Sequence, residues 1–476
     1  MNKLNEMTIV EAARALRARE ITTRELWDAC AEATEEKNPE LNAYLEIFDA
    51  DDTAISAAQE RINREGDAAP LLCGIPLAIK DNILIEGKIA SAASKMLESY
   101  RATYDATVIH KLKEAGALFL GRTNMDEFAL GGSTENSAFG ETKNPHDTTR
   151  VSGGTSGGSA AAVAAHLAIA ALGTDTGGSV RNPASYCGVV GLKPTYGAVS
   201  RFGVIAAASS FDQVGPLTKT VEDAQILFDT VRGQDPKDST SIPEDLYGAA
   251  RREVRTIGVP TRLFADALDA EMLERFQSAL KKCGCKVVDI EIPSAKPALA
   301  AYYIINFAEV STNLARFDGM RYGLSKQGET LLDDYLLSRT EGFGEEARRR
   351  ILLGTFVLSS GYIDAYYRQA VAARTELTRE FNEAFKEVDI IATPTMPTPA
   401  FKIGEKSDPL SLYLEDAFTV LANLTGMPAI SVPMGSVERE GPSTSLGIKK
   451  QLPVGIHFTA PHQAENVLFA IGSAIY

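Results

Sequence analysis

Two glycine-rich segments and one lysine carry the residue types that hydrolysis through a serine nucleophile requires. The second segment, GTDTGGS at 173–179, places Ser179 directly after paired glycines. Consecutive glycines let backbone amides converge, so this turn can stabilise an oxyanion. The amides belong to Thr176, Gly177, Gly178 and Ser179. A phosphate-binding loop is the alternative, but neither glycine segment has the Gly-x-x-x-x-Gly-Lys-Ser/Thr pattern.

The nucleophile needs a base, and a lysine is the best candidate. The chain has five histidines, none beside a glycine turn or in a metal-ligand pattern, so we expect surface or core imidazoles and no metal site. A lysine can act as a base only if burial or a nearby cation lowers its pKa. Lys80 ends the apolar run GIPLAI, which predicts a side chain at the carboxyl edge of a sheet. A solvated Lys80–Asp81 pair is the alternative.

Composition excludes several classes of protein. A net charge of −15 argues against a chain that binds nucleic acid by itself. The charged N-terminus does not resemble a signal peptide, and no window reaches the length of a membrane-spanning helix, so we expect a cytoplasmic protein with no membrane contact. The cysteines are odd in number and scattered, which indicates no disulfide framework. The one close pair, Cys283 and Cys285, is expected to be two ordinary thiols.

Hydrophobic patterns predict an α/β protein. Residues 7–35 read as two amphipathic helices, and 71–121 as strand, loop, helix and strand. The Ala-rich segment 160–172 is expected to be a helix between the two glycine loops. A polar stretch at 235–255 separates this core from a helix-rich region that begins with the strand-like RTIGVP. Segments at 390–399, 428–433 and 452–458 are expected to be strands that return to the same sheet.

Three of these segments together resemble the amidase signature family. They are GIPLAIKDN (74–82), GGTSGGSAAAVAA (153–165) and GTDTGGSVRNPASYCGVVGLKPTYG (173–197). The resemblance implies a Ser–cis-Ser–Lys triad, with Ser179 as the nucleophile and Lys80 as the base. It also implies a large central mixed β-sheet with helices on both faces and a helical lid. The whole chain, 1–476, would be one domain, with N-terminal helices at 1–60, the catalytic core at 61–240, the lid at 241–390 and returning strands at 391–476.

The middle member of the triad departs from the family pattern. The matching position is Thr155, where the family has serine, and Ser156 follows it. A threonine hydroxyl makes the same hydrogen bonds, although β-branching restricts its χ1 angle. We expect the proton relay to pass through Thr155. A relay through Ser156 is the alternative.

A narrower resemblance covers nearly the whole chain. GRTNMDEFALGGSTENSAFGETKNP (121–145) and SRTEGFGEEARRRILLGTFVLSSGYIDAYY (338–367) are similar to segments of the A subunits of glutamyl-tRNA(Gln) amidotransferases. This resemblance implies free glutamine as substrate, with ammonia passed to a B subunit that uses ATP and Mg, and a C subunit joining the two. The chain itself would need no cofactor and would meet tRNA only through the B subunit.

Glutamine carries an α-carboxylate and an α-ammonium, so its pocket should offer a guanidinium and a carboxylate. The resemblance assigns these roles to Arg350 and Asp416, with Tyr302 as a wall. Arg349 is an alternative to Arg350.

Two other functions fit the sequence. One is a stand-alone amidase that acts on another amide. The other is a catalytically weakened scaffold subunit, suggested by Thr155 and by the abrupt C-terminus FAIGSAIY.

Overall fold

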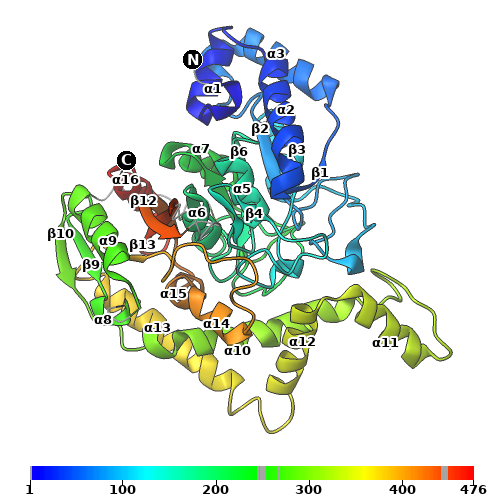
Figure 1. Ribbon diagram of the computed structural model, residues 1–476, viewed down its shortest axis with the longest axis vertical. Helices are drawn as coiled ribbons and strands as arrows, with labels where there is room; N and C mark the ends of the chain where they lie inside the picture. The colour runs from blue at the N-terminus through cyan, green and yellow to red at the C-terminus, as the bar shows by residue number, and fades with distance from the viewer. Residues whose placement is uncertain (1–2, 244–245, 247–252, 265–266, 441–448, 476) are drawn as a thin grey trace.

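A single mixed β-sheet organises the molecule. The computed structural model describes residues 3–475 except 244–245, 247–252, 265–266 and 441–448. Within these residues the strands of the large sheet lie in the order β1 (Tyr44–Ile47), β3 (Leu118–Thr123), β2 (Pro76–Lys80), β6 (Ala170–Asp175), β8 (Gln213–Thr218), β7 (Val190–Lys193), β12 (Ala429–Glu440), β13 (Lys449–Thr459), β11 (Ile390–Pro394), β9 (Thr256–Val259) and β10 (Lys286–Asp289). Helices cover both faces of the sheet (Figure 1), as predicted.

The strand directions change across the sheet. β2 runs parallel to β3 and β6, and β9 runs parallel to β10 and β11. The strands between them pair antiparallel, from β6 through β8, β7, β12 and β13 to β11. The late segments 390–399, 428–433 and 452–458 therefore contribute β11, β12 and β13, as expected. A small hairpin, β4 (Lys143–Asn144) and β5 (Asp147–Val151), lies outside the large sheet.

The helices before and around the glycine segments are α1 (Ile9–Arg17), α2 (Thr23–Leu41), α3 (Asp52–Glu65), α4 (Thr107–Glu114), α5 (Gly157–Ala164), α6 (Arg181–Cys187) and α7 (Val221–Val231). The two expected N-terminal helices are α1 and α2. Both start with a capping box, Thr8 with Glu11 and Thr22 with Glu25. Each box satisfies amide groups that the first turn leaves without partners.

The later helices are α8 (Thr261–Phe264), α9 (Ala270–Lys282), α10 (Ala295–Asn313), α11 (Leu331–Gly342), α12 (Glu345–Val357), α13 (Tyr367–Ala384), α14 (Pro409–Tyr413), α15 (Val420–Thr425) and α16 (Glu465–Ser473). α12 and α13 each pack against α10, and α11 extends away from the body (Figure 1). The region 241–390 also supplies β9 and β10 to the large sheet. The division of the chain into four segments stays a prediction, and part of the polar stretch 235–255 lies outside the described residues.

The prediction for residues 160–172 was wrong in its second half. The helix α5 ends at Ala164, His166 takes a left-handed φ of 60°, and 170–175 forms the strand β6. β6 is completely buried between β2 and β8. A buried strand has no polar side, so an apolar run does not distinguish it from a buried helix. The first glycine segment therefore lies at the start of α5, and the second lies at the end of β6.

Candidate active site

Lys80 lies at the end of β2 with its ammonium group enclosed by hydroxyls. The side chain is fully buried, and Nζ is 2.8 Å from Oγ1 of Thr155, 2.8 Å from Oγ of Ser156 and 2.8 Å from Oγ1 of Thr174. Burial lowers the pKa of Lys80 to about 7, although nearby buried carboxylates oppose the shift. The solvated Lys80–Asp81 pair is therefore excluded. A large fraction of the amine is neutral at pH 7 and can accept a proton.

The two hydroxyls beside Lys80 differ in their other partners. Ser156 Oγ donates to the carbonyl of Thr174 at 3.1 Å and accepts from the amide of Thr174 at 3.3 Å. Its proton is thus already bound to a backbone acceptor. Thr155, which follows a cis peptide bond from Gly154, has Lys80 as its one side-chain hydrogen-bond partner among the described residues. The geometry favours Thr155 as the group that is free to pass a proton.

Ser179 follows β6 at the mouth of the site. Its carbonyl accepts from the amide of Ser156 at 3.1 Å, so the two glycine loops are directly joined. Its side chain retains slight exposure, 6% for the residue, whereas Thr155 and Lys80 have none. In the described part of the chain Ser179 Oγ has no hydrogen-bond partner, and the link from Thr155 to Ser179 is not formed. Catalytic hydrogen bonds of this kind often form only with substrate bound.

The residues 175–179 form the turn that carries Ser179, which we call the nucleophile turn. Its backbone amides divide into two groups. The Gly178 amide donates to Asp175 Oδ1 at 3.0 Å, so it does not point to an oxyanion as the sequence suggested. The amides of Gly177 and Ser179 have no acceptor within the described residues. Both glycines are sterically required, because a Cβ would come within 2.3 Å of the Tyr302 hydroxyl at Gly177 and 2.4 Å of Thr419 Oγ1 at Gly178. Thr176 donates its hydroxyl to Asp212 at 2.7 Å.

A buried ion pair that the sequence analysis did not identify holds this turn in place. Asp175 accepts from Arg181 Nη2 at 2.8 Å, and both side chains are completely buried. Arg181 also bonds to the carbonyl of Thr419, to Asn423 Oδ1 and to His457 Nε2. The positive charge of Arg181 keeps the pKa of Asp175 well below its usual range. The pair ties the start and end of the turn to β13 and α15.

Among the described residues, other buried carboxylates and an imidazole lie near the site without bonding to Lys80, Thr155 or Ser179. Asp126 and Asp212 are buried, and burial raises the pKa of each to about 6. Asp126 accepts amides from Thr134 and Asn136 and lies against Gly154, where a Cβ would be 2.2 Å away. Burial and the charge of Arg181 push the pKa of His457 well below its usual range. None of the described histidines bonds to Lys80, Thr155 or Ser179, and no described cluster of His, Cys, Asp or Glu could hold a metal ion.

The predicted substrate residues lie on one side of the nucleophile turn. Tyr302 comes from α10 and its hydroxyl borders Gly177. Asp416 precedes α15, and Thr419 connects it to the turn by donating to the carbonyls of both Asp416 and Gly177. Tyr303 donates to Asp416 Oδ2 at 2.6 Å. Burial raises the pKa of Asp416 to about 7, against the opposing effects of Tyr303 and Arg350.

Arg350, and not Arg349, is the inward residue of its triplet. The Arg350 side chain is 4% exposed and that of Arg349 is 34% exposed. Arg350 Nε donates to Glu346 at 2.7 Å and Nη1 donates to Asn306 at 3.2 Å. The rings of Tyr303, Phe307 and Tyr413 surround its guanidinium at 5.3 to 5.9 Å. Nη2 has no partner among the described residues and can face an anion.

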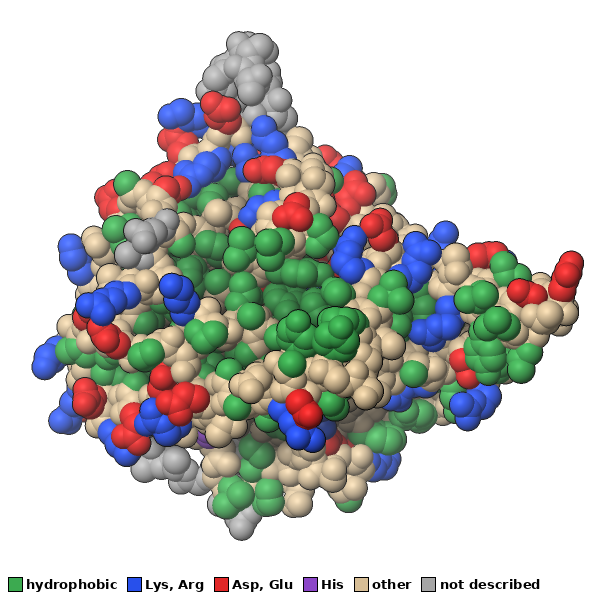
Figure 2. All heavy atoms as spheres, turned by 90° about the horizontal axis from the view of Figure 1, so that it is seen from below, with side chains coloured by type: hydrophobic (Ala, Val, Ile, Leu, Met, Phe, Trp, Pro, Cys, Tyr) green, Lys and Arg blue, Asp and Glu red, His purple; other side chains and the backbone are tan. Residues whose placement is uncertain are grey.

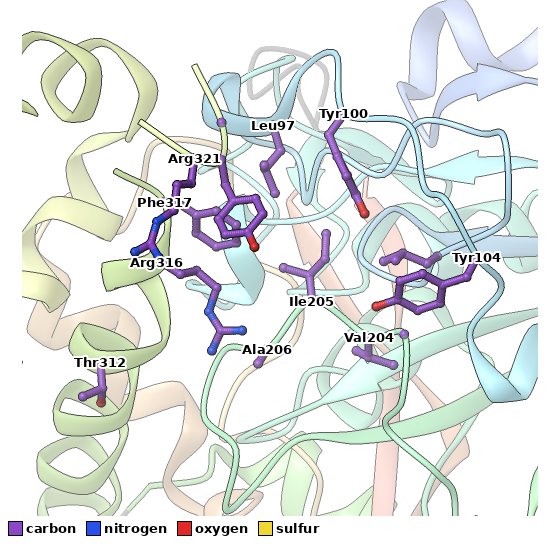
Figure 3. Close-up of a pocket in the computed structure, with 14 residues that line it drawn as sticks. Leu97, Tyr100, Tyr104, Val204, Ile205, Ala206, Thr312, Arg316, Phe317 and Arg321 are labelled. Atoms are coloured by element: carbon purple, nitrogen blue, oxygen red, sulfur yellow. The ribbon is translucent and has the colours of Figure 1, made fainter. Parts of the chain in front are cut away.

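A separate cavity lies beside the site. It has a volume of about 730 Å³, and its lining includes Tyr100, Tyr104, Ile205 and Arg316 (Figure 3). The Ile205 amide donates to the carbonyl of Asn82, two residues beyond Lys80. None of the predicted site residues lines this cavity, so it is distinct from the candidate active site.

The comparisons with known proteins agree with this geometry. The Amidase family model matches residues 25–469. The chain belongs to the amidase family. The A subunit of a glutamyl-tRNA(Gln) amidotransferase from Koribacter versatilis is 47% identical, and the match covers 99% of this chain and 98% of that protein. The crystal structure of the corresponding A subunit from Thermotoga maritima is 40% identical, covers 99% and 94% of the two chains, and has a TM-score of 0.77.

Amidases with other names are more distant in sequence. A peptide amidase from Stenotrophomonas maltophilia is 27% identical, with 99% and 96% of the chains covered and a TM-score of 0.80. The family prediction and the fold prediction are confirmed. The identities favour the amidotransferase reading over a stand-alone amidase. No helix in the described part of the chain is long and apolar enough to cross a membrane.

Proposed function

We propose that this chain is the glutamine-hydrolysing component of a tRNA-dependent amidotransferase that converts Glu-tRNA(Gln) to Gln-tRNA(Gln). The observation that carries the proposal is the buried amine of Lys80, which has a pKa of about 7 and lies 2.8 Å from the Thr155 hydroxyl behind the nucleophile turn. The similarity of the chain to A subunits of such enzymes supports the biological reaction. The intact surroundings of Lys80 argue against a weakened scaffold.

In the proposed mechanism Ser179 Oγ attacks the side-chain carbonyl carbon of glutamine. Its proton passes to the Thr155 oxygen while the Thr155 proton passes to neutral Lys80. The amides of Thr176, Gly177 and Ser179 stabilise the oxyanion, and Gly178 shapes the turn. Protonated Lys80 returns the proton through Thr155 to the leaving nitrogen, which departs as ammonia. Water then hydrolyses the γ-glutamyl ester of Ser179 by the same relay.

Substrate specificity follows from the two charged groups beside the turn. Arg350 would bind the α-carboxylate through its free Nη2 edge, and Asp416 would bind the α-ammonium when it is ionised. Tyr302 would form the wall between these two charged groups and the nucleophile turn. Glutamine is thus held by both ends of its zwitterion with the amide toward Ser179.

The ammonia would be used elsewhere in the complex. We infer a heterotrimer in which a B subunit uses ATP and Mg to activate Glu-tRNA(Gln) and a C subunit joins the other two chains. This chain itself would use no cofactor and would act in the cytoplasm. Its net charge of −15 supports indirect contact with tRNA through the B subunit.

Replacement of the nucleophile separates the two half-reactions. In the assembled enzyme Ser179→Ala should abolish Gln-tRNA(Gln) formation from glutamine and leave formation from ammonium chloride at the wild-type rate. Ser436→Ala on β12, whose hydroxyl bonds to Gln451, is the matched control and should keep both rates. If Ser179→Ala formed Gln-tRNA(Gln) from glutamine at the wild-type rate, Ser179 would not be the nucleophile. If the wild-type enzyme formed no Gln-tRNA(Gln) from either glutamine or ammonium chloride, the proposed amidotransferase activity would be refuted.

A further inference from the structure

The peptide unit between Gly177 and Gly178 is held at both of its polar groups. Its amide, on Gly178, donates to Asp175 Oδ1 at 3.0 Å. Its carbonyl, on Gly177, accepts from Thr419 Oγ1 at 2.6 Å. The amides of Gly177 and Ser179, which have no acceptor within the described residues, belong to the peptide units directly before and after it. The orientation of this one peptide unit therefore sets the frame from which both free amides point.

The other carbonyls at the end of the nucleophile turn are held by backbone amides. The Gly178 carbonyl accepts from the amide of Asn182, in the first turn of α6, at 2.7 Å. The Ser179 carbonyl accepts from a backbone amide of the other glycine loop. The Gly177 carbonyl differs, because the donor that the described residues provide for it is a side chain, Thr419, 242 positions away in the chain. A substitution at this position therefore releases one carbonyl of the turn and leaves the others bound.

Thr419 is fully buried against the turn, directly before α15. Only a glycine at 178 admits its hydroxyl, because a Cβ there would lie 2.4 Å from Thr419 Oγ1. The carbonyl of Thr419 accepts from Arg181 Nη1 at 2.9 Å, so the buried ion pair fixes the backbone of Thr419 independently of its hydroxyl. A buried carbonyl that loses its donor is unfavourable where it stands. Loss of the hydroxyl should thus let the Gly177–Gly178 peptide unit turn while Thr419 itself stays in place.

The candidate substrate residue Asp416 does not depend on this hydroxyl. Thr419 Oγ1 lies 3.2 Å from the Asp416 carbonyl, but the amide of Thr419 donates to the same carbonyl at 3.1 Å. The Asp416 carboxylate is bound separately, by the hydroxyl of Tyr303. Removal of the Thr419 hydroxyl should therefore act on the nucleophile turn and leave the residues for glutamine binding where they are.

We propose that Thr419 is a positioning residue for the reaction at Ser179: its hydroxyl orients the Gly177–Gly178 peptide unit so that the amides of Gly177 and Ser179 converge on the oxyanion. This inference rests on the proposed function, from which it takes the nucleophile and the oxyanion donors. Such donors stabilise the developing charge only if they are fixed before it forms. A small displacement of a group in a catalytic site can cost a large factor in rate.

The test compares three substitutions of Thr419 in glutamine hydrolysis. Thr419→Val keeps the size of the side chain and removes the hydroxyl, so kcat should fall roughly 10- to 100-fold, while KM changes little because Asp416 and Arg350 stay in place. Thr419→Ala should show the same loss of kcat without the branched side chain. Thr419→Ser restores the hydroxyl and should recover most of the wild-type kcat. The unfolding temperature of each variant verifies that it is folded.

Thr425→Val is the matched control. Thr425 lies at the end of α15 and is 5% exposed. Its hydroxyl donates to the carbonyls of Leu421 at 2.9 Å and Ala422 at 3.5 Å, both in its own helix. This variant also deletes a buried threonine hydroxyl close to the turn, but it should keep a kcat near the wild-type value.

Three results would overturn the role of Thr419. One is a wild-type kcat in both Thr419→Val and Thr419→Ala. Another is an equal loss in Thr419→Ser and Thr419→Val, since the hydroxyl would then not be the group that matters. The third is a higher KM with kcat unchanged, which would assign Thr419 to glutamine binding.

A second substrate separates this inference from the proposed function. The aryl amide p-nitroacetanilide has no α-carboxylate or α-ammonium, so its hydrolysis needs the nucleophile turn but neither Arg350 nor Asp416. A wild-type chain that cleaves this amide and not glutamine would refute the proposed function. The Thr419 variants would still be expected to lose kcat on p-nitroacetanilide by the same factor, and wild-type rates there would overturn the inference.

Discussion

The glycine-rich centre and the helical arm, which consists of α11 and α12, bury opposite kinds of side chain. In the centre Lys80, Thr155 and Arg181 are completely buried, and their polar groups are hydrogen-bonded. In the arm Leu332 and Leu352 are largely exposed while Ser338 is buried. Buried charge is tolerated only where it is hydrogen-bonded, and exposed apolar surface persists where another molecule covers it. The contrast teaches that the candidate chemistry lies where polar groups are buried and hydrogen-bonded, whereas the arm leaves apolar side chains at the surface (Figure 2).

The largest expected effect comes from the lysine at the centre. Lys80→Ala should lower kcat for glutamine hydrolysis by about 10³-fold or more, because the relay loses its proton acceptor. Lys193 is the matched control, since it too is fully buried with a pKa lowered to about 7 but bonds only to the carbonyl of Pro194 among the described residues. Lys193→Met should lower stability and largely keep kcat in the fraction that folds. Equal losses of kcat in both variants would show that burial of a lysine, and not the relay, is what matters.

The next effect separates the two hydroxyls beside Lys80. Thr155→Val keeps the branched shape and removes the hydroxyl, so kcat should fall by about 10²-fold. Thr155→Ser should preserve or raise the rate. Ser156→Ala should cost less than Thr155→Val, because its hydroxyl is bound to Thr174. Steady-state assays of the purified variants measure this, and a normal rate in Thr155→Val with a collapse in Ser156→Ala would move the relay by one residue.

A substitution of Arg350 tests where the substrate site ends and the helical arm begins, since α12 carries both the buried Arg350 and the exposed Leu352. Arg350→Gln should raise the KM for glutamine roughly 10- to 100-fold with a smaller effect on kcat, as expected for loss of a hydrogen bond between charged groups. Arg349→Gln is the matched control and should leave KM close to the wild-type value, because Arg349 pairs with Glu345 and Glu346 near the surface. A larger KM in Arg349→Gln than in Arg350→Gln would reverse the assignment.

The smallest expected effect is the pH dependence of kcat and of the KM for glutamine. Lys80, lowered to a pKa of about 7, must lose its proton to act as a base, so kcat should rise with pH from 6 to 8 and fall about tenfold per unit well below 7. Asp416, raised to a pKa of about 7, must also lose its proton to bind the α-ammonium. The KM for glutamine should therefore fall over the same range in the wild type but stay flat in Asp416→Asn. A kcat that is constant between pH 6 and 8 would contradict a lysine base.

Local sequence was sufficient for some parts of the site. The apolar run before Lys80 predicted a strand end, and the paired glycines predicted a backbone turn that presents Ser179. Both features depend on neighbours in the chain. The resemblance to a family then supplied Thr155 and the substrate residues, whose contacts span long separations.

Other parts could not be predicted from local patterns. The contact of Arg181 with His457 joins residues 276 positions apart, and nothing near either residue encodes it. The Gly178 amide turns toward Asp175 because that carboxylate is buried beside it. The strand β6 was mistaken for helix because a fully buried strand has no alternation. In each case the tertiary contact decided the structure.

The most direct test of the central claim is identification of the covalent intermediate. Wild-type chain quenched in acid while it hydrolyses glutamine, then digested and weighed by mass spectrometry, should carry one γ-glutamyl group on the peptide containing Ser179. Thr155→Val should form that ester more slowly, and Ser179→Ala should not form it. A γ-glutamyl group on Thr155, Ser156 or a cysteine in the wild type, with Ser179 unmodified, would contradict the account.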